Sequence, residues 1–170
     1  MDIDQVAALI KQGESNNLEF KKSTTQIKPA FQTVCAFLNG IGGVVLIGVT
    51  DDGQIVGQDV ADNTRQEIAR EITKIEPTAQ IEIFYVPIKG NKYVIVIDAD
   101  SGKHAPYTYD GRAFERNQST TVRMTQHGYE QLIVERGQLN HSWEESIATS
   151  YTIDDLDFDE MFGDEKILIE

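Results

Sequence analysis

The sequence contains one cysteine, three histidines, four prolines and no long hydrophobic run. The single Cys35 excludes an internal disulfide, and one cysteine with three scattered histidines argues against a tetrahedral zinc site. No stretch approaches the ~18 consecutive apolar residues that a membrane-spanning helix needs. The first residues are acidic where a signal peptide carries basic ones. These absences predict a cytoplasmic protein that contacts no membrane.

The composition that remains is that of an ordinary globular domain, with 40% hydrophobic and 25% charged residues. The net charge of −13 is unevenly distributed along the chain. Residues 1–130 carry 13 Lys/Arg against 17 Asp/Glu, whereas residues 131–170 carry 2 against 11. The front part could therefore sort its charges into a basic face for a polyanion. We expect one domain over residues 1–138, followed by an acidic linker or docking tail over 139–170.

Hydrophobic periodicity predicts an α/β (α+β) fold with a mixed sheet of about six strands and about four helices. The apolar run 44–49 is typical of a central strand that is covered on both faces. Apolar residues at helical spacing predict helices over 3–12, 30–39, 63–75 and 126–135. Alternating or continuous apolar runs predict strands over 18–21, 44–49, 81–88, 92–99, 113–116 and 119–123.

Acidic side chains follow the first helix and the central strand. Glu19 and Lys21 are two residues apart on a strand and share a face, and Asp51 and Asp52 come after the central strand. If the two strands are neighbours, Glu14, Glu19 and Asp51 converge, and three carboxylates attract Mg²⁺ or Mn²⁺. Lys21 would then stabilise a charged transition state. The alternative, which spacing alone favours, is a solvated strand face and an acidic turn.

The glycine-rich segment 39–43 runs from a helix into a strand. It therefore presents the carbonyl end of a helix dipole, which repels a phosphate, and it lacks the Gly-Lys-Ser/Thr ending of a P-loop. We interpret it as a helix C-cap and expect no nucleotide cofactor. Cys35, on an apolar helix face, is interpreted as a small packed residue rather than a nucleophile.

Aromatic residues alternate with Arg, Ser and Thr between residues 104 and 121. Such a mixture can stack on bases and bond to phosphates. In the equally weighted alternative, Tyr107 and Phe114 pack in the core and Arg116 pairs with a carboxylate. The candidate nucleic-acid contacts are Lys21, Lys22, Lys103, His104, Tyr107, Arg112, Arg116, Ser119 and Thr120.

Several motifs occur in one order: GESNNLEFKKS (13–23), CAFLNGIGGVVLIGVTDDGQIVG (35–57) and PYTYDGRAFERNQSTT (106–121). Over roughly residues 10–135 the sequence resembles the Schlafen-type AlbA-like domain. It departs from the family pattern at Leu38, where an alanine is usual, and at Gln118, where a glycine is common. The resemblance implies a nucleic-acid-binding domain, as in DNA-binding transcriptional regulators. Such domains often form the N-terminal part of a larger protein, ahead of an ATPase-like region.

Some animal Schlafen proteins cleave transfer RNA at a metal site of three carboxylates. The resemblance places Glu14 and Glu19 on the two glutamates of that site. Asp51 is the third candidate ligand and Asp52 the reserve, although Thr50 stands where many relatives carry an acid. A metal-dependent endoribonuclease acting on structured RNA is therefore an alternative function, so whether the domain is an enzyme stays open.

Two further expectations concern partners. A protein-interaction module, docked through the acidic tail, is the second alternative function. Animal relatives contain two such lobes in tandem and this chain supplies one, so a homodimer could rebuild the groove between the lobes.

Overall fold

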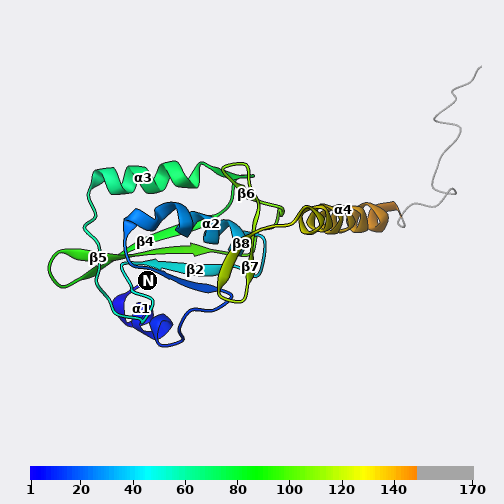
Figure 1. Cartoon of the computed structure of the whole chain (residues 1–170). Coiled ribbons are helices and arrows are strands. Elements are labelled where there is room, and N and C mark those ends of the chain that lie inside the picture. The colour runs from blue at the N-terminus through cyan, green and yellow to red at the C-terminus, as the bar shows by residue number, and fades with distance from the viewer. Residues whose placement is uncertain (149–170) are drawn as a thin grey trace, which may run out of the picture. The chain divides into compact units, whose positions relative to one another are not determined.

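A four-stranded mixed sheet with the strand order β1-β2-β5-β4 forms the centre of the fold (Figure 1). β1 runs parallel to β2, whereas β2 and β4 both pair antiparallel with β5. The computed structural model describes residues 1–148, with side chains to residue 137. The sheet strands are β1 (Leu18–Lys21), β2 (Gly43–Ile47), β4 (Ile81–Ile88) and β5 (Lys92–Ala99).

The remaining short strands form two separate ribbons. β3 (Ile75–Glu76) pairs with β6 (Thr108–Tyr109), and β7 (Phe114–Asn117) pairs with β8 (Thr120–Arg123). The predicted α+β class and mixed sheet are confirmed. The sheet has four strands rather than about six because β7 and β8 pair only with each other.

The described part of the chain contains four α-helices. They are α1 (Ile3–Ile10), α2 (Ile27–Leu38), α3 (Asp62–Ile72) and α4 (Gln126–Ala148), with a short 3₁₀ turn before α2. Figure 1 shows α2 and α3 over one face and α1 over the other. Residues Met1–Ile133 form one compact unit, which contains every site considered below. Most of the predicted acidic tail, residues 149–170, lies outside the described residues.

Alternate residues of the central strands build two separate cores. Val45 and Ile47 of β2 pack on the α2 side, whereas Leu46 packs on the α1 side with Val6. Because the side chains of a strand alternate between faces, a strand covered on both faces must be apolar throughout. The apolar run of β2 is therefore explained by this three-layer arrangement.

A buried carboxylate joins α3 to the β3–β6 ribbon. Glu71 is 5% exposed, accepts a hydrogen bond from the Tyr109 hydroxyl and pairs with the Lys74 ammonium at 2.7 Å. Burial opposes ionisation of Glu71, but these two donors outweigh it and hold the pKa of the carboxyl below its usual range. The contact with Glu71 also contributes, after burial, to a raised pKa of Tyr109. The ionised carboxylate therefore stabilises the fold.

This arrangement predicts an acid-sensitive contribution to stability. Because the folded pKa is lowered, the contribution is present above the unfolded value of about 4.3 and is lost as pH falls through the folded value. Glu71→Gln removes the titrating group. The free energy of unfolding of this variant should therefore fall less between pH 5 and pH 3 than that of the wild type. Urea unfolding across this range measures both slopes. Equal slopes for the two proteins would contradict the assignment.

Of the helices described, none combines the length and hydrophobicity needed to cross a lipid bilayer.

Candidate nucleic-acid interface

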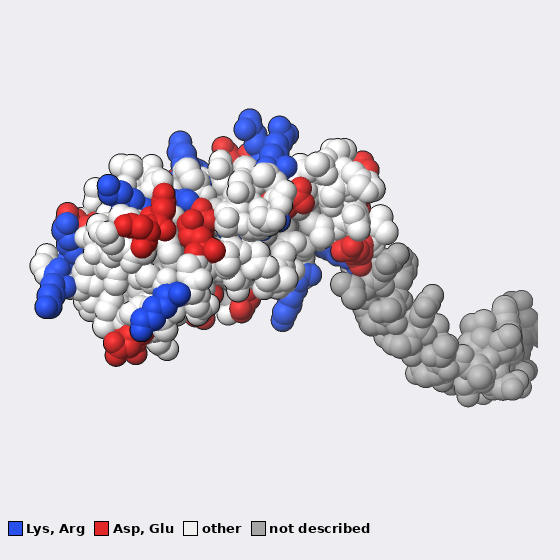
Figure 2. All heavy atoms as spheres, turned by 60° about the horizontal axis from the view of Figure 1, so that its bottom comes forward, with Lys and Arg blue, Asp and Glu red and all other residues white. Residues whose placement is uncertain are grey.

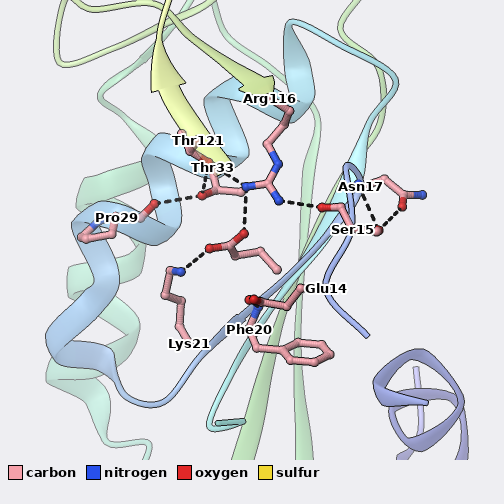
Figure 3. Close-up of polar contacts among 10 residues, drawn as sticks. Glu14, Ser15, Asn17, Phe20, Lys21, Pro29, Thr33, Arg116 and Thr121 are labelled. Atoms are coloured by element: carbon pink, nitrogen blue, oxygen red, sulfur yellow. Dashed lines mark hydrogen bonds and ion pairs between the residues drawn. The ribbon is translucent and has the colours of Figure 1, made fainter. Parts of the chain in front are cut away.

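An ion-pair cluster of Glu19, Lys21 and Arg116 joins β1 to the β7–β8 ribbon. Figure 3 shows its Lys21 and Arg116 side chains. One carboxylate oxygen of Glu19 accepts from Arg116 Nη1 at 2.8 Å, and the other pairs with the Lys21 ammonium. The side chains of Glu19 and Arg116 are only 10% and 6% exposed. Arg116, a predicted nucleic-acid contact, therefore points into the protein. This agrees with the alternative prediction, in which Arg116 pairs with a carboxylate.

The guanidinium of Arg116 makes further contacts inside the protein. Nη1 also donates to Thr121 Oγ1 at 2.8 Å, and Nη2 donates to the Ser15 carbonyl at 2.6 Å. The guanidinium carbon lies 5.3 Å from the centre of the Phe37 ring. The Thr121 hydroxyl lies 2.7 Å from that of Thr33 on α2 (Figure 3). Arg116 therefore ties the ribbon to β1 and α2 together.

The other predicted metal ligands have separate surroundings. Glu14 is exposed and its Oε1 accepts from the backbone N–H of Phe20 at 2.8 Å. Asp51 and Asp52 line a shallow pocket of about 620 Å³ at the carboxyl ends of β1 and β2. Lys22 lines the same pocket. The two strands are neighbours, as predicted, but Lys22 rather than Glu19 lines the pocket with Asp51.

Asp52 belongs to the turn that follows β2. It accepts hydrogen bonds from the Thr50 hydroxyl and, at 2.7 Å, from the Gln54 amide. The Thr50 hydroxyl and, more weakly, the Gln54 amide hold the pKa of this exposed carboxyl below its usual range. After this turn the chain pairs back through a single bridge between Val49 and Ile55. Asp52 is therefore explained by turn chemistry.

These carboxylates do not fit a divalent cation as they stand. Both oxygens of Glu19 are taken by cationic side chains, and one oxygen of Glu14 is taken by a peptide N–H. Among the side chains described, those of residues 1–137, no group of three His, Cys, Asp or Glu is placed to hold a metal ion. The Mg²⁺ or Mn²⁺ site therefore stays a prediction, and the contacts of Glu19 favour an ion-pair cluster in its place.

Asn39, at the end of α2, anchors the segment that follows β5. Its side-chain amide donates to the carbonyls of Tyr107 and Phe114 at 2.9 and 3.0 Å, and its Oδ1 accepts from the Tyr107 N–H at 2.6 Å. Gly102 packs directly on this region, because a Cβ there would lie 2.1 Å from the Tyr107 ring. One amide side chain thus fixes the path of two loop segments.

The predicted nucleic-acid contacts and the aromatic residues near them divide into buried and exposed groups. Tyr107 is 2% exposed and Phe114 8%, so both pack in the core rather than offering a stacking surface. Cys35 packs beside them, and burial raises the pKa of its thiol to about 12, which agrees with a packed residue. The exposed candidates are Lys22, Lys103, His104, Arg112, Ser119 and Thr120.

Residues 101–125 carry a net positive charge within an acidic chain. They carry four Lys/Arg and two Asp/Glu, a formal charge of +2 against −13 for the whole chain. Lys103, Arg112 and Arg123 are exposed, and none of their side chains has a hydrogen-bond or salt-bridge partner among the described residues. Figure 2 shows that acidic and basic side chains are interspersed on the face it presents, without one dominant basic patch. Unpartnered positive charge is thus present in this segment, as it is at other exposed lysines such as Lys22, Lys89 and Lys92.

Sequence reasoning did not select Arg123, Thr125 or Tyr129, which lie next to Arg112 in the structure. A running sum of charge along the chain would have found Arg123. The family position where glycine is common, Gln118, has φ 55° in the turn between β7 and β8. This is the left-handed region that glycine enters without strain, so the family pattern and the turn agree.

Comparison with known proteins gives a consistent result. A family model described as Schlafen, AlbA_2 matches residues 14–125. One similar solved structure is the N-terminal domain of a RecG-related protein, named for an ATP-dependent DNA helicase, from Nitrosomonas europaea. It is 22% identical with a TM-score of 0.50, and the match covers 71% of this chain and 93% of that domain. The likeness supports the fold.

A second solved structure is more distant. The DIP2311 protein of Corynebacterium diphtheriae is 17% identical with a TM-score of 0.49. The match covers 72% of this chain but only 29% of that protein. No curated protein matches the sequence.

Proposed function

Because the chain belongs to the Schlafen AlbA_2 family, we propose that its domain binds nucleic acid. The observation that supports this most directly is the basic segment 101–125, whose exposed Lys103, Arg112 and Arg123 lack partners among the described residues. Cations without internal partners are available to phosphates, and neutralising phosphates releases counterions and drives binding. Ser119 and Thr120, exposed in the β7–β8 turn, add hydroxyl groups of the kind that bond to phosphate oxygens.

We also propose that the domain acts as a module of a larger regulatory protein. The support is the solved relative from Nitrosomonas europaea, which is the N-terminal domain of a protein related to a DNA helicase. A second copy of the chain and an ATPase-like neighbour are the partners that the family resemblance suggests. Sedimentation of the chain with and without nucleic acid measures the first of these.

Binding is expected without metal and should weaken steeply with salt. Three or four phosphate contacts predict a loss of affinity on the order of 50-fold between 50 and 200 mM salt. Fluorescence anisotropy with labelled duplex DNA, single-stranded DNA and transfer RNA, in EDTA and in Mn²⁺, measures this. Failure to bind any of the three at 50 mM salt would contradict the proposal. Cleavage of the RNA in Mn²⁺ but not in EDTA would favour the endoribonuclease alternative.

A further inference from the structure

A pocket of about 350 Å³ lies between the turn after β6, the end of β8 and the first turn of α4. No acidic side chain lines it, whereas the pocket at the ends of β1 and β2 is lined by two aspartates. Its polar lining residues are Thr108, Arg112, Arg123, Thr125, Gln126 and Tyr129. The charged side chains that line it are therefore both cationic, which favours an anion.

Two arginines define the chemistry of the pocket. Arg112 sits in a turn closed by two backbone hydrogen bonds with Tyr109, at 2.9 and 3.1 Å. Arg123 lies on β8, in register with Phe114 of β7. Both side chains are exposed, and neither has a hydrogen-bond or salt-bridge partner in the part of the chain that the structure describes. Two unpaired guanidinium groups on ordered backbone suit the bidentate geometry of a phosphate.

The start of α4 supplies the remaining groups. The Thr125 hydroxyl accepts from the Gly128 N–H at 3.1 Å, so its own proton stays available to donate. The first N–H groups of a helix lack partners within the helix and favour an anion. Tyr129, one turn further, lines the same pocket with an aromatic ring that is partly exposed. An aromatic ring beside a phosphate site is a surface on which a base can stack.

We propose that this pocket binds a nucleotide, with Arg112 and Arg123 on its phosphate and the Tyr129 ring against its base. The ligand is a nucleoside monophosphate unit, either free or within a single strand, because both present the same phosphate and base. For a nucleotide within a single strand, the inference deepens the proposed function and rests on it. For a free nucleotide, it does not depend on the proposed function. The proposal gives Arg123, Thr125 and Tyr129 a ligand-binding role alongside Arg112.

The test compares two variants of equal charge change in the full chain. Arg112→Gln with Arg123→Gln removes both guanidinium groups. Lys89→Gln with Lys92→Gln removes two exposed cations at the β4–β5 turn, which Figure 1 shows at the opposite end of the sheet from β7 and β8. Labelled U₁₀ is titrated by anisotropy, and AMP and inorganic phosphate are titrated by amide chemical shifts. Thermal melts establish that both variants fold as the wild type does.

We expect the arginine variant to bind U₁₀ about tenfold more weakly and the lysine variant no more than about twofold more weakly. AMP should shift the amides of residues 111–129 more than inorganic phosphate does, because only AMP carries a base. Equal losses of U₁₀ affinity in both variants would overturn the proposal that this pocket binds a nucleotide, while the proposed nucleic-acid binding would stand.

The remaining outcomes separate the pocket from the proposed function. If U₁₀ does not bind but AMP shifts these amides in the wild type and not in the arginine variant, the pocket stands for a free nucleotide and the proposed function loses its support. If neither AMP nor phosphate shifts them and U₁₀ binding is unaffected by the arginine variant, the pocket proposal is wrong.

Discussion

Glu19→Gln is expected to lower the free energy of unfolding by about 3 kcal/mol. Glu19 is the carboxylate between Arg116 and Lys21, whose side chains are 6% and 14% exposed. Neutralising it leaves both cations with little water and no counter-charge, and such an uncompensated pair costs more than the loss of one hydrogen bond. The glutamine amide keeps the shape of the side chain and one acceptor, so the loss reports mainly on charge.

Urea unfolding at neutral pH measures this loss, with Glu67→Gln as the matched control. Glu67 is exposed on α3 and has no partner among the described residues, so its replacement should change stability by less than about 0.5 kcal/mol. Similar small effects in both variants would show that the cluster around Glu19 contributes little to the fold.

The same variant distinguishes an ion pair from a metal site. As an ion-pair partner, Glu19 predicts that wild type and Glu19→Gln respond alike to Mn²⁺ in calorimetry. As a metal ligand, it predicts that Mn²⁺ binds the wild type, that binding falls in the variant, and that stability without metal changes little. The ion-pair assignment therefore predicts a loss of stability with unchanged metal binding, whereas the metal-site assignment predicts a loss of metal binding with little change in stability.

Asn39→Ala is the second large effect, with an expected loss of about 3 kcal/mol. The substitution leaves the Phe114 carbonyl without its donor, the Tyr107 carbonyl with only the weak Cys35 thiol donor, and the Tyr107 N–H without its acceptor. Buried backbone groups that lose their partners cost about 1–3 kcal/mol each, and partial relaxation reduces the sum. Asn39→Asp keeps the acceptor but places a negative charge beside two carbonyl oxygens, so it should destabilise at least as much.

Thermal or urea unfolding of both variants checks this, with Asn16→Ala as the control. Asn16 is exposed and its side chain has no hydrogen-bond partner among the described residues, so a loss below about 0.5 kcal/mol is expected. An Asn39→Asp variant as stable as the wild type would contradict the assigned orientation of the Asn39 amide.

Local patterns were sufficient to predict the main elements of the fold. The continuous apolar run of β2 indicated a strand covered on both faces, and its residues do pack alternately on α2 and α1. The number of strands in the sheet was less accessible, because β7 and β8 have strand periodicity but pair only with each other. Periodicity identifies a strand but does not identify its neighbours.

The candidate site was harder to predict, because its contacts join distant parts of the chain. Glu19 and Arg116 are 97 residues apart, so the spacing that suggested a carboxylate cluster could not show that a cation occupies it. Tyr107 has the residue type of a stacking platform, yet its burial depends on Asn39 and Gly102. Residue type suggests what a side chain can do, whereas tertiary contacts decide whether it is free to do it.

The central claim is that nucleic acid binds through residues 101–125 while Glu19 forms an ion pair rather than a metal site. Amide chemical-shift mapping tests it most directly. The ¹⁵N-labelled chain is titrated with whichever nucleic acid binds most tightly, once in EDTA and once in Mn²⁺. The proposed function predicts that the largest shifts fall in residues 101–125, and the ion-pair assignment of Glu19 predicts that they are the same with and without metal. Shifts centred on Glu14, Glu19 and Asp51 that arise only in Mn²⁺ would contradict it.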